Sequence, residues 1–169
     1  MKPAAFHYHA PKTVDEAVAL LAEVAPQDGR VLAGGQSLVP TMAFRLAKPT
    51  HLVDINGVAG LDRIEAAGGN LKIGACVRHA AFERPVCDGP LGKLLADVMR
   101  HIAHYPIRNR GTFCGSLAHA DPASEWCLVL AALERRMAHA GADLEIAAGG
   151  FNPVEARNAV DVDEMRGLG

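Results

Sequence analysis

The spacing of apolar residues predicts a chain in which helices alternate with short strands. A first helix is expected to begin after Thr13 and to end before Pro26, because Thr13 and Glu16 form a capping-box pattern and the residue before a proline avoids helical geometry. Its apolar positions recur every three or four residues, as on one helix face, at Val14, Ala17, Val18, Leu21 and Ala22. This pattern predicts an amphipathic helix at the start of the chain.

Two further helices are predicted in the second half of the chain. One begins near Pro90 and is expected to end at Pro106, and its apolar face carries Leu91, Leu94, Leu95, Val98, Met99 and Ile102. The other has Ser124 at its N-cap and extends to Leu133. Trp126 lies at helical spacing with Leu130. It therefore belongs either in the core, which the spacing favours, or against a ring of a bound cofactor.

Short apolar runs predict the strands. Residues 31–33 and 51–55 are expected to be strands on either side of a helix that Ser37 caps, so that residues 1–57 form an α/β lobe. Residues 63–66 and 71–75 predict a hairpin, and 136–140 with 143–147 a second one. Mixed helices and hairpins indicate an α+β second lobe over 58–147, followed by a polar tail, 148–169.

Composition narrows the class of protein. The chain has 169 residues, of which 50% are hydrophobic and 21% charged, and its formal net charge of −2 gives no reason to expect a nucleic-acid or membrane-surface partner. No apolar run approaches the roughly 20 residues of a membrane span, and the N-terminus lacks a signal-peptide pattern, so we expect a cytoplasmic protein. The four cysteines form no C-x-x-C motif, which favours reduced, mostly buried thiols.

Two glycine-bearing segments are the candidate binding elements. The first, 33–37, follows a strand and holds Gly34 and Gly35, which permit close backbone approach, and Gln36 and Ser37, which add side-chain donors. Such loops suit a diphosphate, although an ordinary strand-to-helix turn explains a Gly-Gly pair equally simply. The patterns G-x-G-x-x-G and G-x-x-x-x-G-K are both absent from the sequence.

The second segment, 110–122, is more distinctive. Thr112, Gly115 and Ser116 are placed to contact the other side of a diphosphate, and the carboxylate of Asp121 to accept hydrogen bonds from a polyol. Asp121 has an alternative role as a turn carboxylate before the following helix. His119 is expected either to face a bound cofactor or to cap a carbonyl. Arg108 and Arg110 either offset phosphate charge or are solvated surface residues.

Together these segments resemble the FAD-binding (medium) subunit of the molybdenum hydroxylases, the group of carbon monoxide dehydrogenase and xanthine dehydrogenase. The resemblance covers about residues 1–138 and includes the runs 33–40, 45–56, 73–79 and 108–125. It implies an α+β, PCMH-type (vanillyl-alcohol-oxidase-like) fold of two subdomains. It also implies that FAD is held by Ala33, Gly34, Gly35, Gln36, Ser37, Leu38, Thr112, Phe113, Cys114, Gly115, Ser116, His119 and Asp121.

The resemblance also implies a role and partners. Such a subunit works with a large molybdopterin subunit and a small subunit carrying [2Fe–2S] clusters, and electrons pass from the clusters through FAD to an acceptor. Related flavoproteins attach FAD covalently through a histidine in the first loop, where this chain has Gln36, so FAD is expected to be bound non-covalently. No catalytic side chain and no metal ligand is expected in this chain.

Two departures from the family pattern leave alternatives open. Cys114 stands where the family usually has a glycine, and its side chain either crowds the diphosphate or points away. We expect weaker FAD binding and not its loss, because Gly115 and the amides of the loop remain. After about Ala140 the sequence no longer resembles the family, whose members continue with a C-terminal domain. Two other hypotheses therefore remain: a truncated or degenerate flavoprotein acting as an interaction module, and a stand-alone flavin oxidoreductase.

Overall fold

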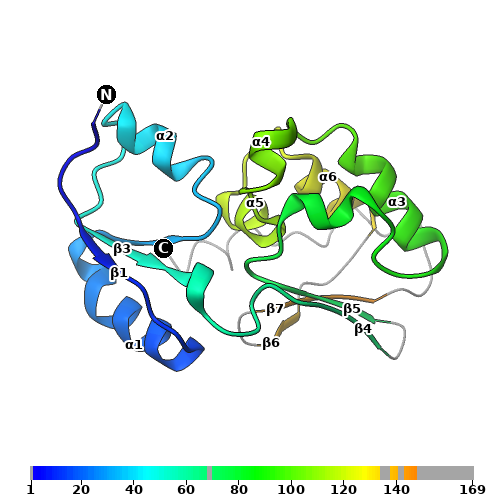
Figure 1. Cartoon of the computed structure of the whole chain (residues 1–169), viewed down its shortest axis with the longest axis horizontal. Coiled ribbons are helices and arrows are strands. Elements are labelled where there is room, and N and C mark those ends of the chain that lie inside the picture. Colours follow the sequence, from blue (N-terminus) through cyan, green and yellow to red (C-terminus); the bar gives the residue numbers. More distant parts are fainter. Residues whose placement is uncertain (1, 68–69, 134–137, 141–142, 148–169) are drawn as a thin grey trace.

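The computed structural model describes residues 2–67, 70–133, 138–140 and 143–147. Its strands form two separate sheets, each with its own helices (Figure 1). The predicted tail, 148–169, lies outside the described residues. In the described part of the chain, no helix is long and apolar enough to cross a membrane.

The first sheet has three parallel strands in the order β1-β3-β2, comprising His7–His9, His51–Asp54 and Gly29–Leu32. Helix α1 (Val14–Val24) and helix α2 (Leu38–Ala43) lie on opposite sides of this sheet (Figure 1). The capping box at the start of α1 is confirmed, since Thr13 Oγ1 accepts from the Glu16 amide and the Glu16 carboxylate accepts from the Thr13 amide. Short 3₁₀ turns, η1 (Ala25–Gln27) and η2 (Ile55–Gly57), follow α1 and β3.

The second sheet is antiparallel in the order β4-β5-β7-β6, comprising Ile64–Ala67, Asn70–Gly74, Asp143–Ala147 and Ala138–Ala140. Both predicted hairpins are present in it. Helices α3 (Gly89–Met99), α4 (Tyr105–Arg108), α5 (Phe113–His119) and α6 (Glu125–Ala132) gather on one side of this sheet, together with the 3₁₀ turn η3 (His79–Glu83) (Figure 1). The arrangement confirms the predicted α+β class.

The main core lies between β5 and the helices of the second part. Three aromatic rings meet at its centre, with ring centroids 4.7–5.2 Å apart for Phe82, Phe113 and Trp126. Trp126 is 1% exposed, so the core position favoured by its spacing is confirmed. Apolar side chains from four elements surround the rings, among them Leu71, Ile73, Leu95, Met99, Leu117 and Leu130.

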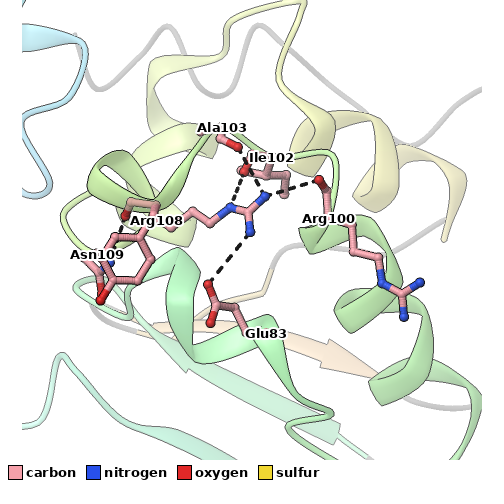
Figure 2. Close-up of polar contacts among 7 residues, drawn as sticks. Glu83, Arg100, Ile102, Ala103, Arg108 and Asn109 are labelled. Carbon is pink, nitrogen blue, oxygen red and sulfur yellow. Dashed lines mark hydrogen bonds and ion pairs between the residues drawn. The ribbon is translucent and has the colours of Figure 1, made fainter.

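The helix predicted to end at Pro106 ends earlier, and Pro106 instead lies in the first turn of α4. The chain leaves α3 at Arg100, and Ala103 adopts a left-handed backbone with φ of +46°. Arg108 stabilises this bend, because Nε donates to the Ile102 carbonyl at 2.8 Å and Nη2 donates to the carbonyls of Arg100 and Ala103 at 3.2 Å (Figure 2). The guanidinium satisfies carbonyls that the end of the helix leaves unpaired.

Candidate functional site

The two glycine-bearing segments line one cavity of about 920 Å³ between the two parts of the fold. This volume falls in the range of small-molecule and cofactor sites. The predicted site residues that line it are Ala33, Gly34, Gly35, Gln36, Ser37, Leu38, Thr112, Gly115, Ser116, His119 and Asp121. Phe113 and Cys114 do not line it. The structure therefore brings together two segments that are almost eighty residues apart in the sequence.

The backbones of the two segments are in direct contact beside the cavity. A Cβ on Gly34 would lie 2.6 Å from the Arg110 carbonyl oxygen and 2.7 Å from the Gly111 Cα. No real Cβ atom approaches backbone this closely, so the contact requires glycine at position 34. A Cβ on Gly115 would in turn lie 3.8 Å from Ala33 Cβ. Glycine at position 34 therefore allows the two segments to approach each other, whereas glycine at position 115 leaves room for Thr112 Oγ1, which a Cβ there would meet at 2.4 Å.

The first segment turns at Gly35, whose φ of +69° is in the left-handed region that favours glycine. The amides of Gly35, Gln36 and Ser37 donate to no acceptor in the part of the chain that the structure describes. The Gln36 side chain folds back, and its Nε2 donates to the Gly34 carbonyl at 3.0 Å. Ser37 occupies the N-cap of α2, but its side chain makes no capping hydrogen bond, so that part of the prediction is wrong.

The second segment is helical where the sequence suggested a loop. Thr112 is the N-cap of α5, and its Oγ1 accepts from the Gly115 amide at 3.1 Å. The amide of Phe113 donates to the Val77 carbonyl at 2.9 Å, which joins the start of α5 to the segment after β5. Thr112 itself is 2% exposed. The start of α5 is therefore held firmly at the cavity wall.

Phe113 and Cys114 face away from the cavity. Phe113 is 0% exposed and belongs to the aromatic centre of the core. The Cys114 sulfur lies 3.7 Å from the carbonyl oxygens of Ile73 and Gly74 on β5. Of the two orientations left open for Cys114, the one that points away from the cavity is observed. Its side chain therefore does not narrow the space for a ligand.

His119 and Asp121 line the cavity and are exposed. Asp121 Oδ1 accepts from the Ala123 amide at 2.8 Å, and the Ser124 amide donates to the Asp121 carbonyl at 2.9 Å. Asp121 is thus a turn carboxylate and a cavity residue at once. Ser124 occupies the N-cap of α6, but its side chain makes no capping bond.

A buried histidine, included from the sequence only within the run 73–79, also lines the cavity. His79 is 4% exposed, and its Nδ1 lies 3.0 Å from Nε1 of Trp126. The indole nitrogen only donates, so Nδ1 accepts and the proton of the neutral ring is on Nε2. Burial, reinforced by the nearby Arg78 charge, lowers the pKa of His79 to about 4. His79 is therefore neutral near pH 7.

Two polar side chains hold the segments in register, and neither was singled out from the sequence. Asn56 Nδ2 donates to the Ala33 carbonyl at 2.7 Å, and Arg78 Nη2 donates to Asn56 Oδ1 at 2.6 Å. Arg78 Nη1 also donates to the Arg110 carbonyl. The only available sequence signal was a polar residue directly after each of two short apolar runs.

Arg108 is neither a phosphate-facing nor a solvated residue. Its guanidinium binds the carbonyls after α3 and lies 3.8 Å from a Glu83 carboxylate oxygen (Figure 2). Arg110 does not line the cavity. Among the residues with described positions, no group of three or more His, Cys, Asp or Glu side chains is arranged to hold a metal ion.

Comparison with known proteins assigns this chain to a family. The family described as "FAD binding domain in molybdopterin dehydrogenase" matches residues 4–149. The chain belongs to this family. The match extends beyond residue 138, where the resemblance noted from the sequence ended.

Relatives of known function carry the same region. The chain is 44% identical to the nicotine 6-hydroxylase medium subunit of Paenarthrobacter nicotinovorans over 133 residues, which are 79% of this chain and 46% of that protein. It is also 44% identical to the carbon monoxide dehydrogenase medium chain of Hydrogenophaga pseudoflava over 126 residues, 74% of this chain and 43% of that one.

Solved structures agree with these sequence matches. Carbon monoxide dehydrogenase from Hydrogenophaga pseudoflava superposes with a TM-score of 0.76 at 39% identity, covering 88% of this chain and 52% of that one. Quinoline 2-oxidoreductase from Pseudomonas putida 86 gives a TM-score of 0.71 with the same identity and coverage. The chain spans about half the length of the relatives it matches.

Proposed function

We propose that this chain binds FAD non-covalently in the cavity between its two glycine-bearing segments. It would do so as the FAD-binding part of an electron-transfer subunit in a molybdenum-containing dehydrogenase complex. The observation that carries the proposal is the contact between Gly34 and the backbone of residues 110–112, which makes the two segments walls of one cavity. Membership of an FAD-binding domain family supports the choice of cofactor.

The chain's own residues fit a dinucleotide. The cavity volume of about 920 Å³ accommodates a large cofactor, and glycine at position 34 lets the two backbone segments that line it meet. The amides of Gly35, Gln36 and Ser37, which have no acceptor among the described residues, are suitable donors for diphosphate oxygens. The carboxylate of Asp121 and the hydroxyl of Ser116 are suited to hydroxyl groups of a ribityl chain.

When bound, FAD supplies the redox chemistry of such a subunit by taking up electrons from iron–sulfur clusters and passing them to an acceptor. The protein's role is to bind and orient the cofactor. This role does not require any side chain of the cavity to act as a general base. The partners would be a large molybdopterin subunit and a small iron–sulfur subunit, in keeping with relatives described as medium subunits or chains.

The proposal is tested by purifying the chain and recording its absorption spectrum. A bound flavin gives a band at about 450 nm. We expect this band, one FAD per chain after titration, and release of all the flavin on denaturation, because Gln36 cannot form the covalent link. A colourless protein that takes up no FAD would contradict the proposal. It would favour the alternative of a non-binding interaction module.

The stand-alone oxidoreductase is separated from the proposal by turnover. The lone chain should oxidise no small substrate with its flavin, because the proposed electron donor is a partner subunit. Sustained turnover of a small substrate by the purified chain would support the stand-alone alternative instead.

A further inference from the structure

We propose that His79 is a cofactor-binding residue whose Nε2–H donates a hydrogen bond to a diphosphate oxygen of FAD, with Trp126 fixing the tautomer that makes this possible. The inference rests on the proposed function and adds to it a binding residue outside both glycine-bearing segments.

The tautomer of His79 follows from its partner. Trp126 Nε1 can only donate, and it lies 3.0 Å from His79 Nδ1 inside the core. Nδ1 must therefore accept, and the ring proton resides on Nε2. Both residues are almost fully buried, at 4% and 1% exposure, so water does not compete for this hydrogen bond. Tilted packing of the two rings, with centroids 6.3 Å apart, keeps the imidazole in one orientation.

The Nε2–H group has no hydrogen-bond partner in the described part of the chain. No acceptor for Nε2 occurs among the residues that the structure describes, although the side chain is more than nine-tenths buried. A buried donor without an acceptor is costly, and such groups occur where a ligand or ordered water completes them. His79 lines the same cavity as Gly34, Gly35 and Thr112. A ligand in this cavity is therefore a suitable acceptor.

Only glycine fits against this ring edge at position 111. A Cβ on Gly111 would lie 2.6 Å from both Nε2 and Cδ2 of His79. The His79 amide also donates to the Gly111 carbonyl at 3.0 Å, which fixes the ring beside the segment that contacts Gly34. Nε2 consequently lies next to the backbone at which the two glycine-bearing segments meet. This position favours the diphosphate as its acceptor.

Neutrality of the ring suits this role. A charged imidazolium in so dry a position would be costly, and burial accordingly lowers the pKa of His79 to about 4. A neutral Nε2–H donates to a phosphate oxygen without adding a buried positive charge. As a neutral donor, the Nε2–H group is closer to a backbone amide than to a cationic side chain that binds phosphate.

The direct test is nitrogen NMR of the full chain with ¹⁵N-labelled histidine. The free protein should show His79 with a protonated Nε2 and an unprotonated Nδ1. Titration with FAD, and separately with ADP as a probe of the diphosphate half, should shift the Nε2 signal and leave Nδ1 little changed. Riboflavin, which has no phosphate, should not shift it. FAD binding without a shift of Nε2, or a shift with riboflavin alone, would overturn the inference.

Two substitutions separate the effect of the Nε2 hydrogen bond on FAD affinity from a general structural effect of replacing His79. His79→Asn keeps an acceptor near Nδ1 for Trp126 and removes the Nε2 donor, whereas His79→Gln places an amide donor near the Nε2 position. We expect FAD to bind about 10-fold more weakly to the first and within about 3-fold of wild type to the second, in line with one lost hydrogen bond. Wild-type affinity in a folded His79→Asn chain would overturn the inference.

The outcomes remain distinguishable from failure of the proposed function. If wild-type protein binds no FAD, the proposed function fails and this inference fails with it. If wild-type protein binds FAD while His79 Nε2 is unaffected, the proposed function stands and the inference alone is wrong. If neither variant folds, the NMR titration of the wild-type chain decides.

Discussion

Arg78 donates from Nη2 to Oδ1 of Asn56 at 2.6 Å, which links the two parts of the fold beside the cavity. Asn56 Nδ2 also donates a hydrogen bond to the Ala33 carbonyl at 2.7 Å, and Arg78 Nη1 donates one to the Arg110 carbonyl. Both glycine-bearing segments are thus attached to one pair of polar side chains. The spacing of the cavity walls depends on this pair as well as on the small size of glycine.

Replacing Arg78 should loosen the cavity. Arg78→Ala removes both hydrogen bonds that join the segments, so we expect a loss of about 1–3 kcal/mol in the free energy of unfolding, as for hydrogen bonds to charged groups. FAD affinity should fall about 10-fold, because the walls are no longer held in register. Urea unfolding and FAD titration measure the two effects. Arg84→Ala, which removes an exposed arginine, is the matched control and should change neither.

The contact at Gly34 predicts a second effect. Gly34→Ala would place a methyl group 2.6 Å from the Arg110 carbonyl oxygen, so the segments must separate. We expect FAD affinity to fall at least 10-fold. Gly57→Ala is the control, since the nearest atom to its Cβ would be the flexible Lys12 Nζ at 3.1 Å and the nearest backbone atom would lie 3.7 Å away. Equal FAD affinity for both variants would show that the contact at Gly34 is not needed.

Replacing Cys114 should lower the free energy of unfolding and change FAD affinity little. Its sulfur faces β5, so Cys114→Gly removes core packing and places glycine inside α5. A loss of about 1 kcal/mol in unfolding free energy is expected from the helical glycine. FAD affinity should remain within about 2-fold of wild type. A several-fold gain in affinity would mean instead that the side chain crowds the cofactor.

The buried histidine predicts a pH dependence of stability. The pKa of His79 is lowered from 6.5 to about 4 in the folded state, so between these values the unfolded chain binds more protons. The free energy of unfolding should therefore fall as the pH drops from 6.5 towards 4, by up to about 1.4 kcal/mol per pH unit. Below pH 4 this contribution stops changing, because the folded state takes up the proton as well.

Urea unfolding at several pH values measures this effect. His79→Gln should flatten the fall between pH 6.5 and 4, because the group that titrates is gone. His119→Gln, which removes an exposed histidine of the cavity lining, should keep the steep fall because His79 remains. An unchanged pH profile in His79→Gln would contradict the assignment of the effect to His79.

Local patterns predicted the local structure well. The capping box at Thr13, both hairpins and the core position of Trp126 follow from short-range spacing, and all are present. Strand β1 was missed because its three residues, His7–His9, show no apolar alternation. Helix α5 was taken for a loop because it has only seven residues and contains Gly115. Such short elements are specified by the contacts around them.

The sequence predicted the two backbone segments of the candidate site but not the side chains that hold them in place. Glycine pairs can be recognised in a sequence, and glycine is the residue expected where two backbone segments come close together. The links through Asn56, Arg78 and His79 join residues 22 to 47 positions apart. No local pattern reports which partner such a side chain has. These residues therefore emerged only from the folded arrangement.

The most direct test of the central claim is an FAD titration followed through the backbone amide NMR signals of the whole chain. If the diphosphate lies between the two segments, the amides of Gly34, Gly35, Thr112 and Gly115 should shift together with a single dissociation constant, while those of Gly60 and Gly89 stay in place. Shifts confined to one segment, or to residues outside the cavity, would contradict the account.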